Sequence, residues 1–158
     1  MEVNKRELFL DLINKLLSSP SKRTYQRIQQ EMSNFFKSDY DIVKIIENQK
    51  SFDFFPTPEE CLNKNEIKDL IKNSNSILEP SAGLGSIMHF IKKINSEAKL
   101  TAVEFNEFFS KLLKFLYPTD MIYNHNFLSF DKDNDFDLII MNPPFSKGGD
   151  NFFYIDFI

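Results

Sequence analysis

The chain has 158 residues, of which 42% are hydrophobic, 27% charged and 15% aromatic. This composition fits one packed domain and excludes collagen, disordered chains and disulfide scaffolds. Four glycines are too few for collagen, and one cysteine cannot form a disulfide scaffold. The net charge of −4 excludes broad attraction to a polyanion, so any contact with nucleic acid must be local or supplied by another protein.

No apolar run reaches the roughly 20 residues of a membrane span, and the N-terminus lacks the apolar core of a signal peptide. We therefore expect a cytoplasmic protein with no membrane contact. The sequence does not distinguish a bacterial, phage or viral origin.

Residues 1–50 carry only helical patterns. An apolar stripe indicates a first helix before Pro20, a second is predicted from Lys22 to about Lys37, and a short third lies near residues 42–46. We interpret this segment as a helical module that packs on the rest of the chain. The basic cluster in its second helix fits a solvated face, formed by Lys22, Arg23 and Arg27.

In residues 51–158, short apolar runs alternate with helical patterns. The predicted strands are Ser76 to Glu79, Leu100 to Phe105, Met121 to Asn124 and Phe136 to Met141. The predicted helices are Glu59 to Lys72, Ser86 to Ile94 and Asn106 to Leu116. This alternation is typical of right-handed βαβ units around a parallel sheet, so the fold class is α/β.

The first predicted strand ends in a carboxylate and turns through two glycines into a helix, in the sequence Glu79-Pro80-Ser81-Ala82-Gly83-Leu84-Gly85. Glycine lets the backbone approach a ligand closely, and a helix N-terminus supplies oriented amides. The third glycine of a dinucleotide fingerprint is missing, since Met88 stands there. Alone, the turn fits a structural role equally well.

Glu104 closes the second predicted strand, about 20 residues after the glycine turn. A carboxylate at that place can accept both hydroxyls of a ribose, or it can cap the helix that follows. Together with the glycine turn it favours nucleoside binding.

Asn142-Pro143-Pro144-Phe145 follows the fourth predicted strand. Neither proline can donate to a strand ladder, so the strand must end there. Asn142 offers an amide oxygen, Pro143 a carbonyl oxygen and Phe145 an aromatic face. This group suits a planar molecule that carries an exocyclic amino group.

With Phe55-Pro56-Thr57-Pro58 ahead of both motifs, residues 52–150 resemble the amino-group DNA methyltransferases that modify adenine. The resemblance implies a partial Rossmann-like methyltransferase sheet of four parallel strands in the order 3-2-1-4. It also implies two parts: an N-terminal helical segment, 1–50, and a methyltransferase core, 51–158. The methyl donor would be S-adenosyl-L-methionine and the partner DNA, with adenine as the target.

The resemblance also implies roles for individual residues. The catalytic group would be Asn142, Pro143, Pro144 and Phe145, which hold the flipped adenine while its amino nitrogen attacks. Cofactor-binding residues would be Thr57, Glu79, Pro80, Ser81, Ala82, Gly83, Gly85, Glu104, Asn126 and Phe127. Asn126 stands where the family has an acid that meets the cofactor's adenine, and Phe127 would be a wall for that ring or a core aromatic.

Four residues, Thr57 among them, also have local interpretations. Thr57 also begins a predicted capping box with Glu60, with Pro58 at the first helical position. His89 and His125 have no partners at metal-ligand spacing, so no metal site is predicted. Cys61 lies on an amphipathic pattern and is interpreted as a packing residue.

Four strands are fewer than a complete methyltransferase sheet, so we expect a C-terminal truncation and no target-recognition region. A second chain or a continuation would then complete the sheet beside the fourth strand, whose apolar sequence is typical of burial on both faces. Two alternatives stay open: a non-catalytic cofactor-binding remnant or half of a split enzyme, and a methylase of RNA adenine or protein glutamine.

Overall fold

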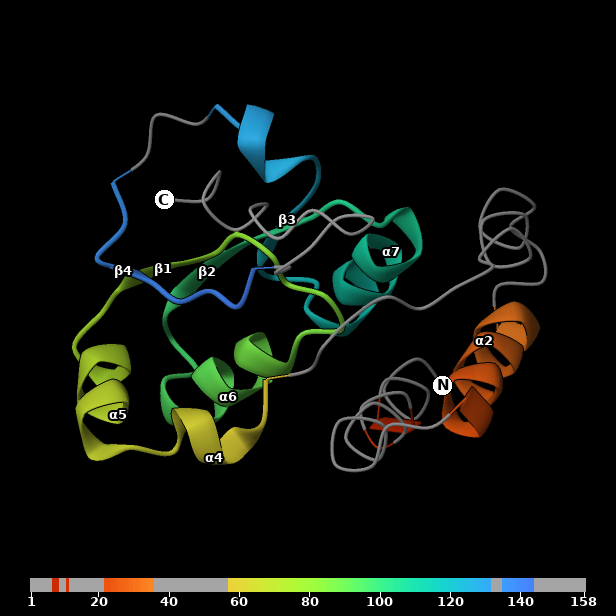
Figure 1. Ribbon diagram of the computed structural model, residues 1–158, viewed down its shortest axis with the longest axis horizontal. Helices are drawn as coiled ribbons and strands as arrows, with labels where there is room; N and C mark the ends of the chain where they lie inside the picture. Colours follow the sequence, from red (N-terminus) through yellow and green to blue (C-terminus); the bar gives the residue numbers. More distant parts are fainter. Residues whose placement is uncertain (1–6, 9–10, 12–21, 36–56, 132–134, 144–158) are drawn as a thin grey trace, which may run out of the picture.

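The computed structural model describes residues 7–8, 11, 22–35, 57–131 and 135–143 (Figure 1). The N-terminal part contains helix α2 (Lys22–Phe35). The remaining elements, in chain order, are α4 (Glu59–Leu62), α5 (Asn65–Lys72), β1 (Ser76–Glu79), α6 (Ser86–Ile94), β2 (Lys99–Glu104), α7 (Glu107–Leu116), β3 (Met121–Asn124), the 3-10 turn η1 (Phe127–Ser129) and β4 (Leu138–Ile139).

The four strands form one parallel sheet in the order β3-β2-β1-β4. Leu78, in the central strand β1, is paired with Thr101 of β2 and with Ile139 of β4. The predicted α/β class, the Rossmann-like arrangement and the order 3-2-1-4 are confirmed. Because β1 lies between β2 and β4, the glycine turn after β1 is adjacent to the segment that follows β4.

One hydrophobic core joins the sheet to its helices. Ile77, Leu100 and Ala102 of the sheet pack against Met88 and Ile91 of α6, and all five are fully or almost fully buried. Burying each of the larger side chains stabilises the fold by about 1.5–3 kcal/mol. α4 and α5 both contact α6, and the three lie together on one side of the strands in Figure 1. The core therefore fixes α6, and with it the turn from which α6 begins.

The predicted helix from Glu59 to Lys72 is wrong in one respect, because it is two helices. Asn63 and Lys64 have non-helical backbone angles, with ψ of 52° and 143°. The break lets Leu62 of α4 and Ile71 of α5 both reach the core, whereas on one straight helix these two positions would lie on opposite faces. Tertiary packing here overrides a continuous helical pattern.

β1, α6 and β3 have the predicted bounds, and the other differences lie at element ends. β2 runs from Lys99 to Glu104, and Phe105 lies outside it and is exposed. α7 begins at Glu107 because Asn106 is its N-cap, and the Asn106 side chain accepts a hydrogen bond from the backbone N–H of Phe109 at 3.1 Å.

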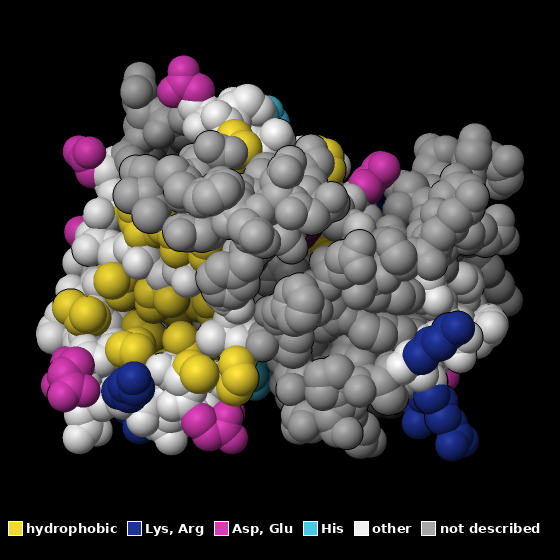
Figure 2. All heavy atoms as spheres, in the orientation of Figure 1, with side chains coloured by type: hydrophobic (Ala, Val, Ile, Leu, Met, Phe, Trp, Pro, Cys, Tyr) yellow, Lys and Arg dark blue, Asp and Glu magenta, His cyan; other side chains and the backbone are white. Residues whose placement is uncertain are grey.

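β4 is much shorter than the predicted strand, although backbone hydrogen bonds extend its pairing with β1 from Asp137 to Ile140. The expectation that it is buried on both faces is wrong, because Ile139 is 49% exposed and Met141 37% exposed. Figure 2 shows hydrophobic side chains gathered on the side of the molecule where β4, α4 and α5 lie. No described strand pairs with the outer edge of β4.

Several predictions on the N-terminal part fall partly outside the described residues. α2 begins at the predicted residue and is described to Phe35, while the first and third predicted helices lie mostly or wholly outside. The basic cluster of Lys22, Arg23 and Arg27 is exposed, as expected for a solvated helix face. Within the described ranges, no helix is both long and apolar enough to span a membrane.

Candidate functional site

Polar side chains collect where the strands end. Glu79 ends β1, Glu104 ends β2, Asn124 ends β3, and Asn142 follows β4 by three residues. All four strands are parallel, so these positions lie along the same edge of the sheet. This edge is the candidate site.

The glycine turn is tied to the neighbouring strand by hydrogen bonds. The backbone N–H of Ala82 donates to the carbonyl of Val103 at 3.1 Å, and that of Gly83 donates to Glu104 Oε2 at 2.6 Å. Gly83 and Gly85 have φ of 56° and 84°, a left-handed conformation that side chains disfavour. The turn is therefore held by β2 as well as by its own sequence.

Gly85 has a packing role that its place in the motif did not indicate. A Cβ atom at this position would lie 2.8 Å from Leu113 Cδ2 on α7 and 3.5 Å from Tyr117 Cε2. Gly85 therefore allows α6 to begin close against α7. Of the other predicted cofactor-binding residues in the turn, Pro80 and Ala82 are buried and Ser81 and Gly83 are half-buried.

Glu79 is a buried acid whose two oxygens differ in their hydrogen bonds. Its side chain is 1% exposed, and Oε1 accepts from the backbone N–H and the hydroxyl of Ser81 at 3.2 and 3.4 Å. Oε2 has no hydrogen-bond partner in the described part of the chain. Burial raises the pKa of the Glu79 carboxyl from 4.5 to about 8; hydrogen bonds from Ser81 oppose the shift and the nearby Glu104 adds to it.

Glu104 acts as a backbone anchor. Oε2 accepts from Gly83 N and Oε1 accepts from Asn106 N, each at 2.6 Å. Burial raises the pKa of the Glu104 carboxyl, and these hydrogen bonds oppose the rise. Each carboxylate oxygen has a second lone pair, so a ribose hydroxyl can still be accepted. Glu104 thus joins the glycine turn to the start of α7, and its contact with a ribose stays a prediction.

Thr57 links the glycine-turn helix to the segment after β4. Its hydroxyl oxygen accepts from Asn142 Nδ2 at 3.1 Å, and its backbone N–H donates to the Ser86 hydroxyl at 3.2 Å. The predicted capping box is wrong, because Pro58 is the N-cap of α4 and makes no side-chain cap hydrogen bond. The Thr57 hydroxyl meets Asn142, 85 residues away. Sequence reasoning missed Ser86, whose only signal was a hydroxyl at the first helical position after the turn.

Beyond β3, the predicted adenine-contacting residues have local roles. Asn126 is exposed, and its Oδ1 accepts from Leu128 N at 3.1 Å, so it caps η1. The Phe127 ring is half-buried and stacks on Phe130 with centroids 6.3 Å apart. Phe127 is therefore not a core aromatic. The contacts of Asn126 and Phe127 with a cofactor stay predictions.

Asn124 is a second residue that sequence reasoning did not single out. Its Nδ2 donates to the carbonyls of Glu104 and Phe105, both at 2.9 Å, and so joins the ends of β3 and β2.

Of the catalytic group, Asn142 and Pro143 are described and half-buried, whereas Pro144 and Phe145 lie outside the described residues. Cys61 is exposed, so its interpretation as a packing residue is wrong. His89 is half-buried and His125 exposed. The described residues contain no group of three or more His, Cys, Asp or Glu side chains that could hold a metal.

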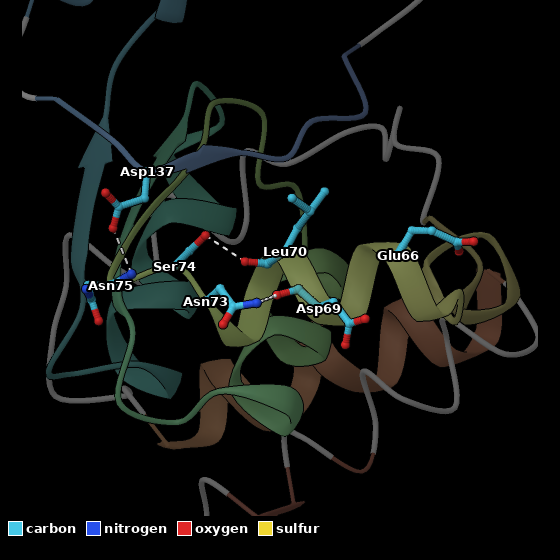
Figure 3. Close-up of a pocket in the computed structure, with 7 residues that line it drawn as sticks. All are labelled: Glu66, Asp69, Leu70, Asn73, Ser74, Asn75 and Asp137. Carbon is cyan, nitrogen blue, oxygen red and sulfur yellow. Dashed lines mark hydrogen bonds between the residues drawn. The ribbon is translucent and has the colours of Figure 1, made fainter.

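A separate pocket lies at the opposite edge of the sheet (Figure 3). One wall is formed by Asn75, which precedes β1, and by Asp137, which precedes β4. The other wall is formed by residues of α5, including Glu66 and Asp69. Asp137 Oδ2 accepts from the backbone N–H groups of Asn75 and Ser76 at 2.8 and 3.0 Å. This pocket is therefore at the amino ends of the strands, away from the candidate site.

Comparison with known proteins gives one family and one relative. Residues 65–156, more than half of the chain, match the family model of the methyltransferase small domain. A protein named type II methyltransferase M.CvrRI, from Paramecium bursaria Chlorella virus XZ-6E, is 33% identical over 70 residues. That match covers 44% of this chain and 18% of the length of the viral protein. No solved structure matches the chain.

Proposed function

The chain belongs to the methyltransferase small domain family, and from that premise we propose that it transfers a methyl group from S-adenosylmethionine to the exocyclic amino group of adenine in DNA. The family match and the viral relative support methyl transfer. The adenine target is supported by the resemblance of Asn142-Pro143-Pro144-Phe145 to the motif of amino-group DNA methyltransferases.

The observation that carries this proposal is the meeting of two motifs through Thr57. Asn142, after β4, is hydrogen-bonded to Thr57, and Thr57 is hydrogen-bonded to Ser86 at the start of α6. Because α6 follows the glycine turn, the amide that would hold an acceptor lies beside the turn that would hold a donor. Methyl transfer needs this juxtaposition, since positioning supplies much of its rate.

The described residues fit a cationic methyl donor. Glu79 has a buried oxygen with no hydrogen-bond partner among those residues, and Glu104 is a second buried acid along the same edge. A buried acid that lacks a partner is costly, and a cationic ligand removes that cost by pairing with the ionised form. When bound, S-adenosylmethionine supplies a methyl group activated by its sulfonium charge. Glu79, Gly83 and Glu104 would hold it, with Glu104 directed to the ribose.

Asn142 and Pro143 would act on the acceptor. An adenine amino nitrogen is a weak nucleophile because its lone pair is delocalised into the ring. Hydrogen bonds from its two hydrogens to Asn142 Oδ1 and to the Pro143 carbonyl favour a pyramidal nitrogen with a localised lone pair. Thr57 engages the Nδ2 side of the Asn142 amide, so Oδ1 is directed away from Thr57. These two residues contribute by positioning and fixed dipoles. As the bond from nitrogen to the methyl group forms and the bond from sulfur to it breaks, the nitrogen becomes strongly acidic and releases a proton to water, so no general base is required.

A methyl-transfer assay with tritium-labelled donor tests the proposal. Asn142→Ala should reduce incorporation into duplex DNA by more than about 10-fold, a loss above about 1.4 kcal/mol. Donor affinity, measured by calorimetry, should be retained. The matched control is Asn73→Ala, which makes the same chemical change at the opposite edge of the sheet, where Asn73 Nδ2 donates to the Asp69 carbonyl; its activity should remain.

The acceptor class is read from the same assay. N6-methyladenine in the DNA product would support the proposal, whereas label in RNA or protein would replace DNA as the substrate. A chain that binds the donor but labels none of the three, alone or with an added partner chain, would be a cofactor-binding remnant.

A further inference from the structure

Two hydrogen bonds connect the rigid core to Asn142. Ser86 is the first residue of α6, and Ile87 and Met88, which follow it, are buried in the core. The Ser86 hydroxyl accepts from Thr57 N at 3.2 Å, and Thr57 Oγ1 accepts from Asn142 Nδ2 at 3.1 Å. The connection is therefore continuous from α6 through Thr57 to the amide. We call these three residues the Ser86–Thr57–Asn142 relay.

We propose that Ser86 and Thr57 are positioning residues, which fix the Asn142 amide for the acceptor through this relay. The proposal rests on the proposed function, in which Asn142 holds the amino group of the acceptor. Ser86 makes its contribution through Thr57, and it is a residue that neither the motifs nor the resemblance singled out.

β4 ends before Asn142, so pairing with β1 does not orient the Asn142 side chain. β4 has two residues, and the described backbone bonds with β1 reach Ile140, whose N–H donates to the Leu78 carbonyl at 3.0 Å. Asn142 lies two residues further on. A side chain beyond the end of a ladder is not oriented by that ladder. The bond to Thr57 supplies an orienting contact at this position.

The direction of the bonds also matters. Thr57 Oγ1 accepts from the amide nitrogen, so the carbonyl end of Asn142 faces away from Thr57. A rotation of the amide by 180° would present N–H groups to an amino group, which also donates. In the observed bond the amide has the rotation that the proposed acceptor requires, and the Ser86 bond keeps the Thr57 backbone in place. Small displacements of such groups cost large rate factors.

The relay is tested first in the free protein, by nuclear magnetic resonance of the Asn142 side-chain amide. Thr57→Val removes the hydroxyl with little change of shape and should shift the Asn142 Nδ2–H signals, whereas Thr57→Ser should preserve them. Ser86→Ala should shift them less than Thr57→Val. The Asn95 amide is the internal reference, because it donates to the carbonyls of Ile71 and Ser74 at 3.0 Å and should not change.

Kinetics test the consequence for catalysis. Thr57→Val should lower kcat by about 10-fold or more, and Ser86→Ala by about 3-fold, with Thr57→Ser close to wild type. Ser86→Ala should leave donor affinity within about 2-fold, since a residue that acts through Thr57 affects the acceptor step.

Unchanged Asn142 signals in Thr57→Val, with unchanged Asn95 signals as proof of folding, would overturn the relay. So would equal kcat values for Thr57→Val and wild type. If the wild-type protein methylates nothing, the proposed function fails, and the resonance comparison still decides whether the relay positions Asn142.

Discussion

Glu79→Gln should remove part of the pH dependence of stability, so that the variant gains stability relative to the wild-type protein as the pH rises. Glu79 is fully buried and its pKa is raised from 4.5 to about 8. Between these values the folded chain keeps a proton that the unfolded chain releases. The unfolded state then binds fewer protons, so the free energy of unfolding falls as the pH rises through this window. Gln cannot ionise and contributes no such loss.

The size of the effect follows from the two pKa values. Between pH 5 and pH 7.5 the wild-type protein should lose about 3 kcal/mol from this group, at about 1.4 kcal/mol per pH unit. This is a large share of a typical stability of about 5–15 kcal/mol. The stability difference between variant and wild type should therefore widen by about 3 kcal/mol, whatever constant cost the buried amide adds.

Urea unfolding followed by circular dichroism at pH 5 and pH 7.5 measures this difference. Glu97→Gln is the control, because it makes the same carboxyl-to-amide change at an exposed position. A constant gap for Glu79→Gln would refute the reasoning, since it would mean that Glu79 has the same pKa in the folded and unfolded chains. Under the proposed function, the same variant should bind the cationic donor more weakly.

The remaining predictions concern two structural contacts and the donor. Gly85→Ala should lower the free energy of unfolding by about 1–3 kcal/mol, because Gly85 has a φ of 84° and an added Cβ atom would lie 2.8 Å from Leu113 Cδ2. Urea titration checks this prediction, and an unchanged free energy would show that α6 can shift. Asp137→Ala should cost about 1–2 kcal/mol by releasing two backbone N–H groups, and Asp137→Asn should cost less in the same titration. Donor affinity, measured by calorimetry, should increase from pH 6 towards pH 8 as Glu79 ionises, and an equal increase in Glu79→Gln would contradict this origin.

The fold could be predicted where local pattern and topology agree. β1, α6 and β3 were predicted with their bounds, because each is a short apolar run or stripe flanked by polar or turn residues. The strand order followed from the resemblance alone, since the rules for parallel connections give the alternation of strands and helices but not the order. The break at Asn63 and Lys64 could not be predicted, since it follows from which residues reach the core rather than from the helical pattern.

The positions of the candidate residues at strand ends could be predicted, whereas their contacts could not. Glu79, Glu104 and Asn142 were selected because polar residues at strand ends carry a positional signal. The bond between Thr57 and Asn142 joins positions 85 residues apart, and the local pattern at Thr57 predicted a helix cap instead. The Gly83 to Glu104 bond was equally hidden, because a backbone N–H has no sequence signal.

β4 is paired with β1 along its length, and side chains anchor it at both ends as well. Asp137 holds the amino end through the N–H groups of Asn75 and Ser76, and Thr57 holds Asn142 beyond the carboxyl end. Between these two sets of hydrogen bonds, Leu138 is half-buried and Ile139 is 49% exposed. Selection on this strand would therefore act on its two flanks and on Leu138 and Ile140, which pack against the core, whereas Ile139 could vary while the spacing from Asp137 to Asn142 is kept.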